Sequence, residues 1–420
     1  MGFKVAKSLK FDSLKKQGLK LILRYGFVIW LWAFLFARVP LAAIQDLFGL
    51  QSRPLLLLDC LSVGFALVAF SQVGWRPWKV FQTSIVRVAY LSFALFWAFY
   101  SLRLVFDHWI LSVDLVTPAS TLFKHLLTST LIPALCLPWI LTLASWGSTL
   151  PVLVGLGSIS LFFGELSFVF ITGFDALMKA RFAFEDLNPI PAAHSSASLV
   201  ILCSLFLWSL FCQNSRATSG YHVWLGLIGA LVGLLGMQLA MTKAAFLALI
   251  PLVLYLACCL WHRFRLFGFA TVLAMSMSAV VLMFGMMHRT LSTSIVDRIE
   301  LLRMSLGIWS DHWLLGIGFR SQGLLFYSPL TKDHWYPHNF LAESLLLGGV
   351  VLAIFLCSFI VSTVITASFD IEAKSVEDTL QVPLTFLWIQ GLASALFSGH
   401  LALIPGLWVC GLVVVLNRYR

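Results

Sequence analysis

The residues best suited to do chemistry stand together in "DHWYPHNFLAESLLLGG", where a polar stretch meets a long apolar run. His338 titrates near neutral pH, so it can take a proton from a hydroxyl group, although a lone histidine at such a boundary also suits a structural role. Glu343 lies within the apolar run, where a carboxylate is costly and therefore marks a candidate functional position. Asn339 and Glu343 are four residues apart and are expected to share a helical face, with Pro337 at the helix start.

The chain that must position these residues is strongly apolar. Of its 420 residues, 60% are hydrophobic and 11% are charged, and the mean hydropathy is +0.94. A soluble domain carries about 25% charged residues, whereas apolar runs of about 18 or more residues recur here from end to end. The sequence therefore predicts an all-α integral membrane protein, with residues 1–420 forming a single polytopic domain in contact with membrane lipids.

The net charge of +10 does not indicate a nucleic-acid partner, because the basic residues gather in the first twenty residues and in short loops. That distribution is typical of cytoplasmic segments of membrane proteins. About twelve transmembrane helices are predicted from the apolar runs. They cover 21–44, 54–73, 88–106, 121–142, 150–172, 195–213, 223–241, 245–261, 267–286, 339–366, 383–399 and 401–416.

Helix parity and charge bias agree on the sidedness of the chain. They place the basic tail 1–20, loop 74–87 and the C-terminal "RYR" in the cytoplasm. Residues 287–338 form the one large outer loop, and it contains an amphipathic segment. The apolar face of that segment is expected to lie along the membrane boundary and consists of Ile299, Leu302, Leu306 and Trp309.

Basic residues on the outer side run against the charge bias and are candidate anion ligands. Lys243 lies in a two-residue break between the seventh and eighth helices, where it can reach toward lipid headgroups or hold an anionic headgroup. Arg298, Arg303 and Arg320 suit a diphosphate, which arginine grips through paired hydrogen bonds, but they also suit a solvated face. Arg181 lies in the outer loop 173–194.

Three other ionisable residues and the cysteines complete the inventory. Glu165 falls inside the fifth helix and is suspect for the same reason as Glu343, whereas Asp59 suits an interfacial position. His400, between the last two helices, lies on the outer side, and the sequence does not separate its possible roles. The eight cysteines fall in apolar segments without metal-ligand spacing, which indicates core residues rather than disulfides or a zinc site.

The segment "YPHNFLAESLLLGGVVL" resembles the signature of the O-antigen ligase and polymerase superfamily. In that signature a histidine and an asparagine open a late membrane helix, and a glutamate and a glycine follow. Here these residues are His338, Asn339, Glu343 and Gly349.

The resemblance is clearest over residues 240–365 and extends upstream of the histidine motif. "VDRIELLRMSLGIW" is similar to the family's amphipathic helix that begins at an arginine, here Arg298, and "HWLLGIGF" is similar to the glycine turn that follows. "RFAFEDLNPIPAAHSSASLVI" resembles the family's outer loop with Asn-Pro before a helix. The sequence departs from the family at Lys243, where arginine is usual, and at Leu352, where a small residue is usual.

The resemblance implies a GT-C-like glycosyltransferase of the bacterial inner membrane, with both termini cytoplasmic and its site facing the periplasm. Its donor is an undecaprenyl-diphosphate-linked glycan, and it needs neither a metal nor a nucleotide sugar. Lys243 and Arg298, with Arg303 and Arg320 beside them, would hold the diphosphate, and His338 would activate or position the acceptor hydroxyl. The supporting residues would be Asn339, Glu343, Gly349 and Arg181. Transfer would invert an α-linked lipid diphosphate to a β-glycoside.

Two other functions remain open at this stage. A ligase transfers the glycan to lipid A-core oligosaccharide, whereas a polymerase of the same superfamily transfers it to a lipid-linked repeat unit. The family's polymerases often carry two large outer loops, so the single loop here favours a ligase. A secondary transporter would show internal repeats and paired broken helices, and neither is evident in the sequence.

Overall fold

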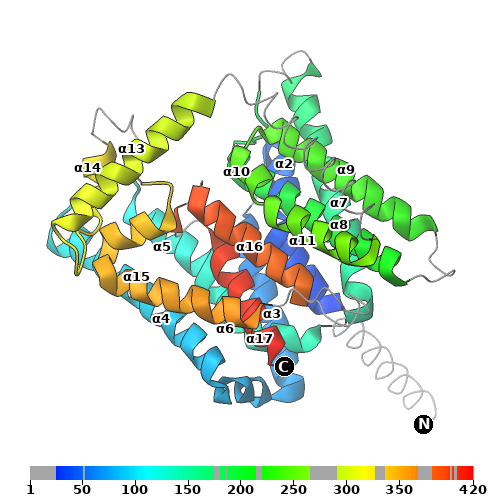
Figure 1. Cartoon of the computed structure of the whole chain (residues 1–420), viewed down its shortest axis with the longest axis horizontal. Coiled ribbons are helices and arrows are strands. Elements are labelled where there is room, and N and C mark those ends of the chain that lie inside the picture. The colour runs from blue at the N-terminus through cyan, green and yellow to red at the C-terminus, as the bar shows by residue number, and fades with distance from the viewer. Residues whose placement is uncertain are drawn as a thin grey trace, which may run out of the picture.

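The computed structural model describes the chain with short gaps and shows an all-helical architecture (Figure 1). The described residues are 25–50, 53–144, 146–174, 180–185, 187–213, 220–264, 291–326, 336–367, 381–397, 400–401 and 404–419. Within these ranges the β pairing consists of one isolated bridge, between Phe184 and Leu187. The predicted tail 1–20 and the predicted helix 267–286 lie outside the described residues.

Eight helices in the described ranges are long and apolar enough to cross a membrane, or nine if one bent pair counts as a single span. The prediction of a polytopic membrane protein is therefore supported by eight spans, and each predicted segment that the structure describes contains a helix. The helices of the spans are α3 (Pro54–Val73), α4 (Ser84–Val105) with η2 (Phe106–Ile110), α5 (Ala119–Leu126) with η3 (Leu127–Leu131), α6 (Ile132–Ile140) and η4 (Leu141–Leu143), α7 (Trp146–Thr172), α8 (Pro189–Gln213), α9 (Gly220–Ala240), α10 (Lys243–Leu247) with α11 (Ile250–Phe264), and α15 (Phe340–Thr366).

Several further helices complete the described fold. The bent pair is Tyr25–Leu35 with α2 (Arg38–Phe48), and the loop helices are α13 (Leu291–Ser310) and α14 (Arg320–Phe326). The others are η1 (Arg76–Gln82), α16 (Gln381–Phe397), η7 (Gly406–Cys410) and α17 (Gly411–Arg418).

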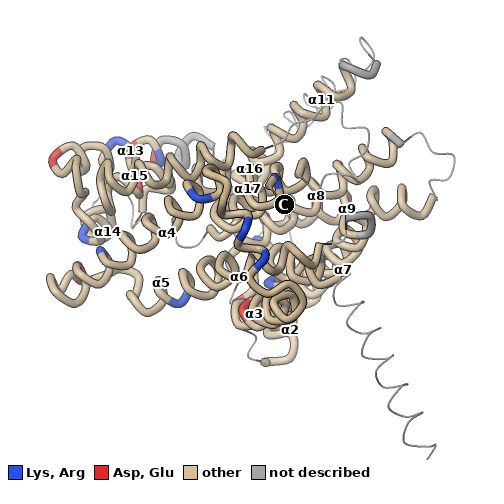
Figure 2. Tube along the Cα trace, turned by 90° about the horizontal axis from the view of Figure 1, so that it is seen from below, with Lys and Arg blue, Asp and Glu red and all other residues tan. Residues whose placement is uncertain are grey.

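The spans are apolar on the outside as well as the inside, as a lipid environment requires. Large side chains such as Phe170 (81% exposed) and Leu231 (66% exposed) point outward, whereas Trp97 and Trp408 pack together in the core with a ring separation of 5.1 Å. Figure 2 shows the charged residues as small groups separated by long uncharged stretches of helix. Of the cysteines, expected in the core, Cys203, Cys259 and Cys410 are buried, but Cys60, Cys258 and Cys357 are exposed.

Two groups of helices flank α16. On one side α7, α8 and α9 pack against one another, and on the other side α15 lies along α4 (Figure 1). Helix α16 contacts α8 from the first group and α17 near the second. Residues from both groups can therefore meet at either end of α16.

The first membrane segment is bent by 61° between Leu35 and Arg38. Pro40 has no backbone N–H and cannot donate to the carbonyl of Phe36 in a continuous helix. That carbonyl instead accepts from the N–H of Val39 at 3.1 Å. The bend therefore brings an arginine, Arg38, to a helix start within the apolar bundle.

A second break lies inside α15 at Gly349, whose backbone angles of φ 61° and ψ −154° are not helical. The loop before α14 fills this break with backbone hydrogen bonds. The N–H of Val350 donates to Trp313 O at 3.0 Å, and the N–H groups of Ile317 and Gly318 donate to Leu346 O at 2.8 and 2.9 Å. Neither broken helix was evident from the sequence.

Glycine is required where these two backbones meet. A Cβ on Gly349 would collide with Leu314 O, and a Cβ on Gly316 would collide with Leu346 O. Both residues also have positive φ angles, which side chains other than glycine disfavour. The glycine turn in "HWLLGIGF" and Gly349 therefore form the two sides of one backbone contact.

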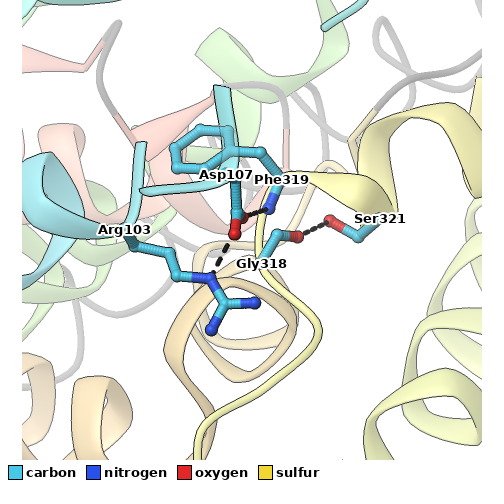
Figure 3. Close-up of polar contacts among 5 residues, drawn as sticks. All are labelled: Arg103, Asp107, Gly318, Phe319 and Ser321. Atoms are coloured by element: carbon cyan, nitrogen blue, oxygen red, sulfur yellow. Dashed lines mark hydrogen bonds and ion pairs between the residues drawn. The ribbon is translucent and has the colours of Figure 1, made fainter. Parts of the chain in front are cut away.

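A third contact ties the same loop to α4 (Figure 3). The carboxylate oxygen Oδ2 of Asp107 lies 3.0 Å from Arg103 Nε and accepts from the N–H of Phe319 at 2.6 Å. Ser321 Oγ donates to Gly318 O at 2.7 Å, which closes the turn before α14. The loop that precedes the histidine motif is thus anchored on two membrane helices.

The amphipathic face predicted for α13 differs from the buried face. Leu301 is fully buried and packs with Leu325 and Leu346, whereas Ile299 and Leu306 are 60% and 41% exposed. The helix buries one apolar face against α15, and Trp309 of the predicted face also packs against this buried cluster. Ile299 and Leu306 remain as an exposed second face. This second face stays available for the membrane boundary that the sequence predicts.

Candidate functional site

The turn that carries His338 is sharper than the sequence predicts. His338 has a φ of 53°, which is unusual for a residue with a side chain. Helix α15 begins at Phe340, and the Asn339 side chain caps it by accepting from the N–H groups of Leu341 and Ala342 at 3.0 and 3.1 Å. The expectation that Pro337 lies at the helix start is therefore wrong, because Pro337 precedes the cap.

Glu343 contacts the connection between the last two helices rather than the Asn339 side chain. Its Oε1 lies 2.9 Å from Nε2 of His400, and its Oε2 accepts from the N–H of Leu401 at 3.0 Å. Glu343 and His400 are 3% and 2% exposed. Because a buried carboxylate needs such partners, this pair fixes the start of α15 against the segment between α16 and α17.

Tyr336 joins the two histidines of the site. Its ring lies 4.2 Å from the ring of His338 and meets the ring of His400 edge-on at 5.6 Å. Burial and the charge of Glu343 raise the pKa of Tyr336 to about 12, against the opposing effect of Arg298. Tyr336 therefore stays protonated near neutral pH, and Arg298 lies close enough to interact with it.

Arg298 is a predicted cation whose charge interacts with Tyr336 of this cluster. Burial lowers its pKa below the ordinary value for arginine, and its interaction with Tyr336 opposes that shift. Arg303 and Arg320 have exposed side chains, on α13 and at the start of α14. None of the three arginines Arg298, Arg303 and Arg320 lines the cavity described next.

A cavity of about 240 Å³ lies beside Tyr336 and His400, between α2, the start of α8, α16 and η7. Its polar lining includes Arg38, His194 and Gln390. The Gln390 amide accepts from Ser198 Oγ at 2.6 Å and donates to His194 O at 2.5 Å, so it joins α16 to α8.

Arg38 is the one arginine or lysine among the residues that line this cavity. Within the described part of the chain, no carboxylate lies within ion-pair distance of its guanidinium. Its charge also acts on the imidazole of His125 in α5. A guanidinium in these surroundings favours an anionic ligand.

At the predicted anion ligand Lys243, the structure describes the backbone. Helix α9 ends at Ala240 and α10 begins at Lys243, so a two-residue break is present. It consists of Met241 and Thr242, and Lys243 is the first residue of α10 rather than part of the break as predicted. The Lys243 side chain lies outside the described part. Arg181 donates from Nε to Ala240 O at 3.2 Å and from its guanidinium to Thr242 Oγ1 at 3.3 Å. Arg181 thus holds the loop before α8 onto the turn that carries Lys243.

Glu165 lies apart from the cavity. It is 3% exposed and packs where α7 meets α8 and α9, close to Ser196 and Gly236. Neither of its carboxylate oxygens has a hydrogen-bond partner among the described atoms. Glu165 therefore does not contribute to the candidate site, although the sequence marked it as a candidate functional residue.

Sequence reasoning missed Arg38, His194 and Tyr336. Arg38 had a signal, because an arginine that interrupts an apolar run is costly and marks a candidate site. His194 and Tyr336 had none, since each matters only through neighbours from other helices. In the described ranges, no three His, Cys, Asp or Glu side chains converge as a metal site would require.

The site therefore combines a histidine motif, a coupled Glu343–His400 pair and a cavity with an arginine. Residues 228–357 match the family model of the O-antigen ligases. The resemblance stated for residues 240–365 is confirmed over this segment. The match supports an enzyme, since O-antigen ligase family members are glycosyltransferase-like ligases and polymerases. No curated protein matches the chain.

The O-antigen ligase segment holds only part of the site. It includes Lys243, Arg298, His338 and Glu343, whereas the cavity residue Arg38 lies far upstream. The His194 and His400 side chains also come from outside the matched segment. The tertiary structure thus joins the family motif to groups that the family model does not cover.

Proposed function

We propose that this protein is an O-antigen ligase-type glycosyltransferase. It moves a glycan from undecaprenyl diphosphate to a lipid A-core acceptor on the periplasmic face of the inner membrane, without a metal and with inversion. One observation carries the proposal. The histidine motif of the family segment stands beside a cavity that contains Arg38, an arginine with no carboxylate partner in the described chain.

The cavity suits the diphosphate of the donor rather than its glycan. Sites for drug-sized ligands measure about 300–1,000 Å³, and this cavity of about 240 Å³ is smaller. Arg38 supplies positive charge inside it, and Arg298 supplies more beside Tyr336. The oligosaccharide therefore extends out of the cavity, toward His338 and the loop helices.

In the proposed transfer step, His338 acts on the hydroxyl group of the acceptor. The acceptor oxygen attacks the anomeric carbon while the bond from that carbon to the diphosphate oxygen breaks, and His338 receives the hydroxyl proton. Cations next to the diphosphate offset the charge that develops on the leaving group. Tyr336 is unsuited to the role of base, because it keeps its proton near neutral pH with a pKa of about 12.

The transporter alternative is disfavoured by how the broken helix α15 is used. In transporters, unwound backbone binds the transported substrate or ion. Here the backbone exposed at Gly349 is occupied by Trp313, Ile317 and Gly318 of the chain itself. The break therefore serves to anchor the loop.

A strain that lacks the gene separates the ligase from the polymerase of the same superfamily. A ligase leaves long glycans on undecaprenyl diphosphate, whereas loss of a polymerase leaves single repeat units. With purified protein, transfer from undecaprenyl-diphosphate-linked glycan to lipid A-core should persist in a metal chelator. Arg38→Gln should weaken donor use, and Arg53→Gln, an exposed arginine that does not line the cavity, serves as its control. Equal donor use by both variants would contradict the diphosphate assignment.

A further inference from the structure

A second, larger cavity lies at the opposite end of α17 from the candidate site. The first cavity is lined by Gly406 and Cys410, and the second by Leu416 and Tyr419. At 1.5 Å per helical residue, Gly406 and Tyr419 are about 20 Å apart. The second cavity has a volume of about 460 Å³ and is enclosed by η1, the end of α6 with η4, and the end of α17.

The charged residues in the lining of this cavity are both basic. Arg76 and Lys79 come from η1 and have exposed side chains, and no aspartate or glutamate lines the cavity. In the described part of the chain, neither side chain has a carboxylate partner. The remaining polar lining is neutral and includes Gln82 and Thr142. The lining therefore attracts an anion.

The walls of the cavity are apolar on the side of the helices. Pro138 and Leu141 from the end of the α5–α6 span form one wall, and Leu416 forms another. A soluble anion requires no such wall, whereas the glycerol and upper acyl chains of a lipid would pack against it.

Tryptophans beside η1 place this cavity at a membrane boundary. Trp75 is 68% exposed, and Trp139 meets the rings of Trp75 and Trp78 edge-on at 5.8 and 5.3 Å. Indole rings favour the level of the lipid headgroups. Basic pockets between transmembrane helices at this level suit anionic headgroups.

We infer that this cavity binds the headgroup of an anionic phospholipid from the leaflet opposite the candidate site. Arg76 and Lys79 hold the phosphodiester, and the glycerol packs against the wall formed by Pro138 and Leu141. The inference rests on this cavity alone and does not depend on the glycosyltransferase proposal.

The test titrates a fluorescent phosphatidylglycerol into the purified full-length protein in an uncharged detergent. Saturable binding is expected, and Arg76→Gln and Lys79→Gln should each raise Kd about fivefold, the equivalent of about 1 kcal/mol per basic residue near the surface. The double variant should raise Kd further than either single variant does. Arg53→Gln, at the other end of α3, removes one charge in the same way and should leave Kd unchanged.

Three results would overturn the inference. They are wild-type affinity in the double variant, equal affinity for a matched phosphatidylcholine, and displacement of the lipid by inorganic phosphate beyond that caused by chloride at equal ionic strength. The last result would identify a site for a soluble anion. Lys79→Glu adds a second check on a correctly folded protein, since charge reversal should weaken binding more than Lys79→Gln does.

Discussion

Removal of the Glu343 carboxylate tests how the site is held together. Glu343→Ala leaves His400 and the N–H of Leu401 buried without their partner, although both now lie within 3.0 Å of the carboxylate. The loss of a buried hydrogen-bond acceptor costs about 1–3 kcal/mol for each donor that it served. Glu343→Gln keeps an acceptor for Leu401 and should cost less, about 1–2 kcal/mol.

The loss should extend to catalysis, because His400 packs against Tyr336 and Tyr336 packs against His338. A displacement of about 1 Å can lower a rate by about 10²-fold. Glycan transfer by Glu343→Ala should therefore fall further than donor binding does. The assays are transfer from a purified undecaprenyl-diphosphate donor, donor binding, and unfolding in mixed micelles followed by tryptophan fluorescence.

A double-mutant cycle with His400→Ala decides whether the pair acts as a unit. If it does, the double variant should lose at least about 1 kcal/mol less than the sum of the single variants, since residues in contact are not additive. Additivity within about 0.5 kcal/mol would refute the coupling. Asp311→Ala, which removes an exposed loop carboxylate, is the matched control and should change stability by no more than about 0.5 kcal/mol.

The other predictions concern single side chains of the site. His338→Ala should reduce transfer by about 10²–10⁴-fold and leave folding and donor binding nearly intact; near wild-type transfer would reduce His338 to a structural residue. Lys243→Ala should weaken donor use and Lys243→Arg should keep or raise activity, whereas equal inactivity of both at normal protein level would indicate a role specific to lysine. The pKa of Tyr336 is raised from 10 to about 12, so the folded protein keeps a proton that the unfolded chain releases, and stability should fall between pH 10 and 12. Tyr336→Phe should flatten this part of the unfolding curve against pH, and an unchanged slope would contradict the assigned burial.

The composition and apolar run lengths by themselves determined the class of protein and the approximate position of each membrane-spanning helix that the structure describes. Both are local properties, since about 18 or more apolar residues in a row must span a bilayer as helix wherever they fold. The order of His338, Asn339, Glu343 and Gly349 likewise indicated the family that the match over residues 228–357 confirms. A two-residue break near Lys243 was also evident from local sequence, although Lys243 begins α10 instead of lying in the break.

The partners of these residues were decided by the tertiary structure. Helical spacing predicted only that Glu343 shares a face with Asn339. The Glu343 oxygens contact His400 and Leu401, which lie 57 and 58 residues later in the chain. Asp107 gave no functional signal, and it holds Phe319 across 212 residues. In both cases a buried carboxylate must find donors to offset its desolvation. Sequence periodicity describes one helix at a time. The donors that reach a buried carboxylate from other helices depend on how the whole bundle packs.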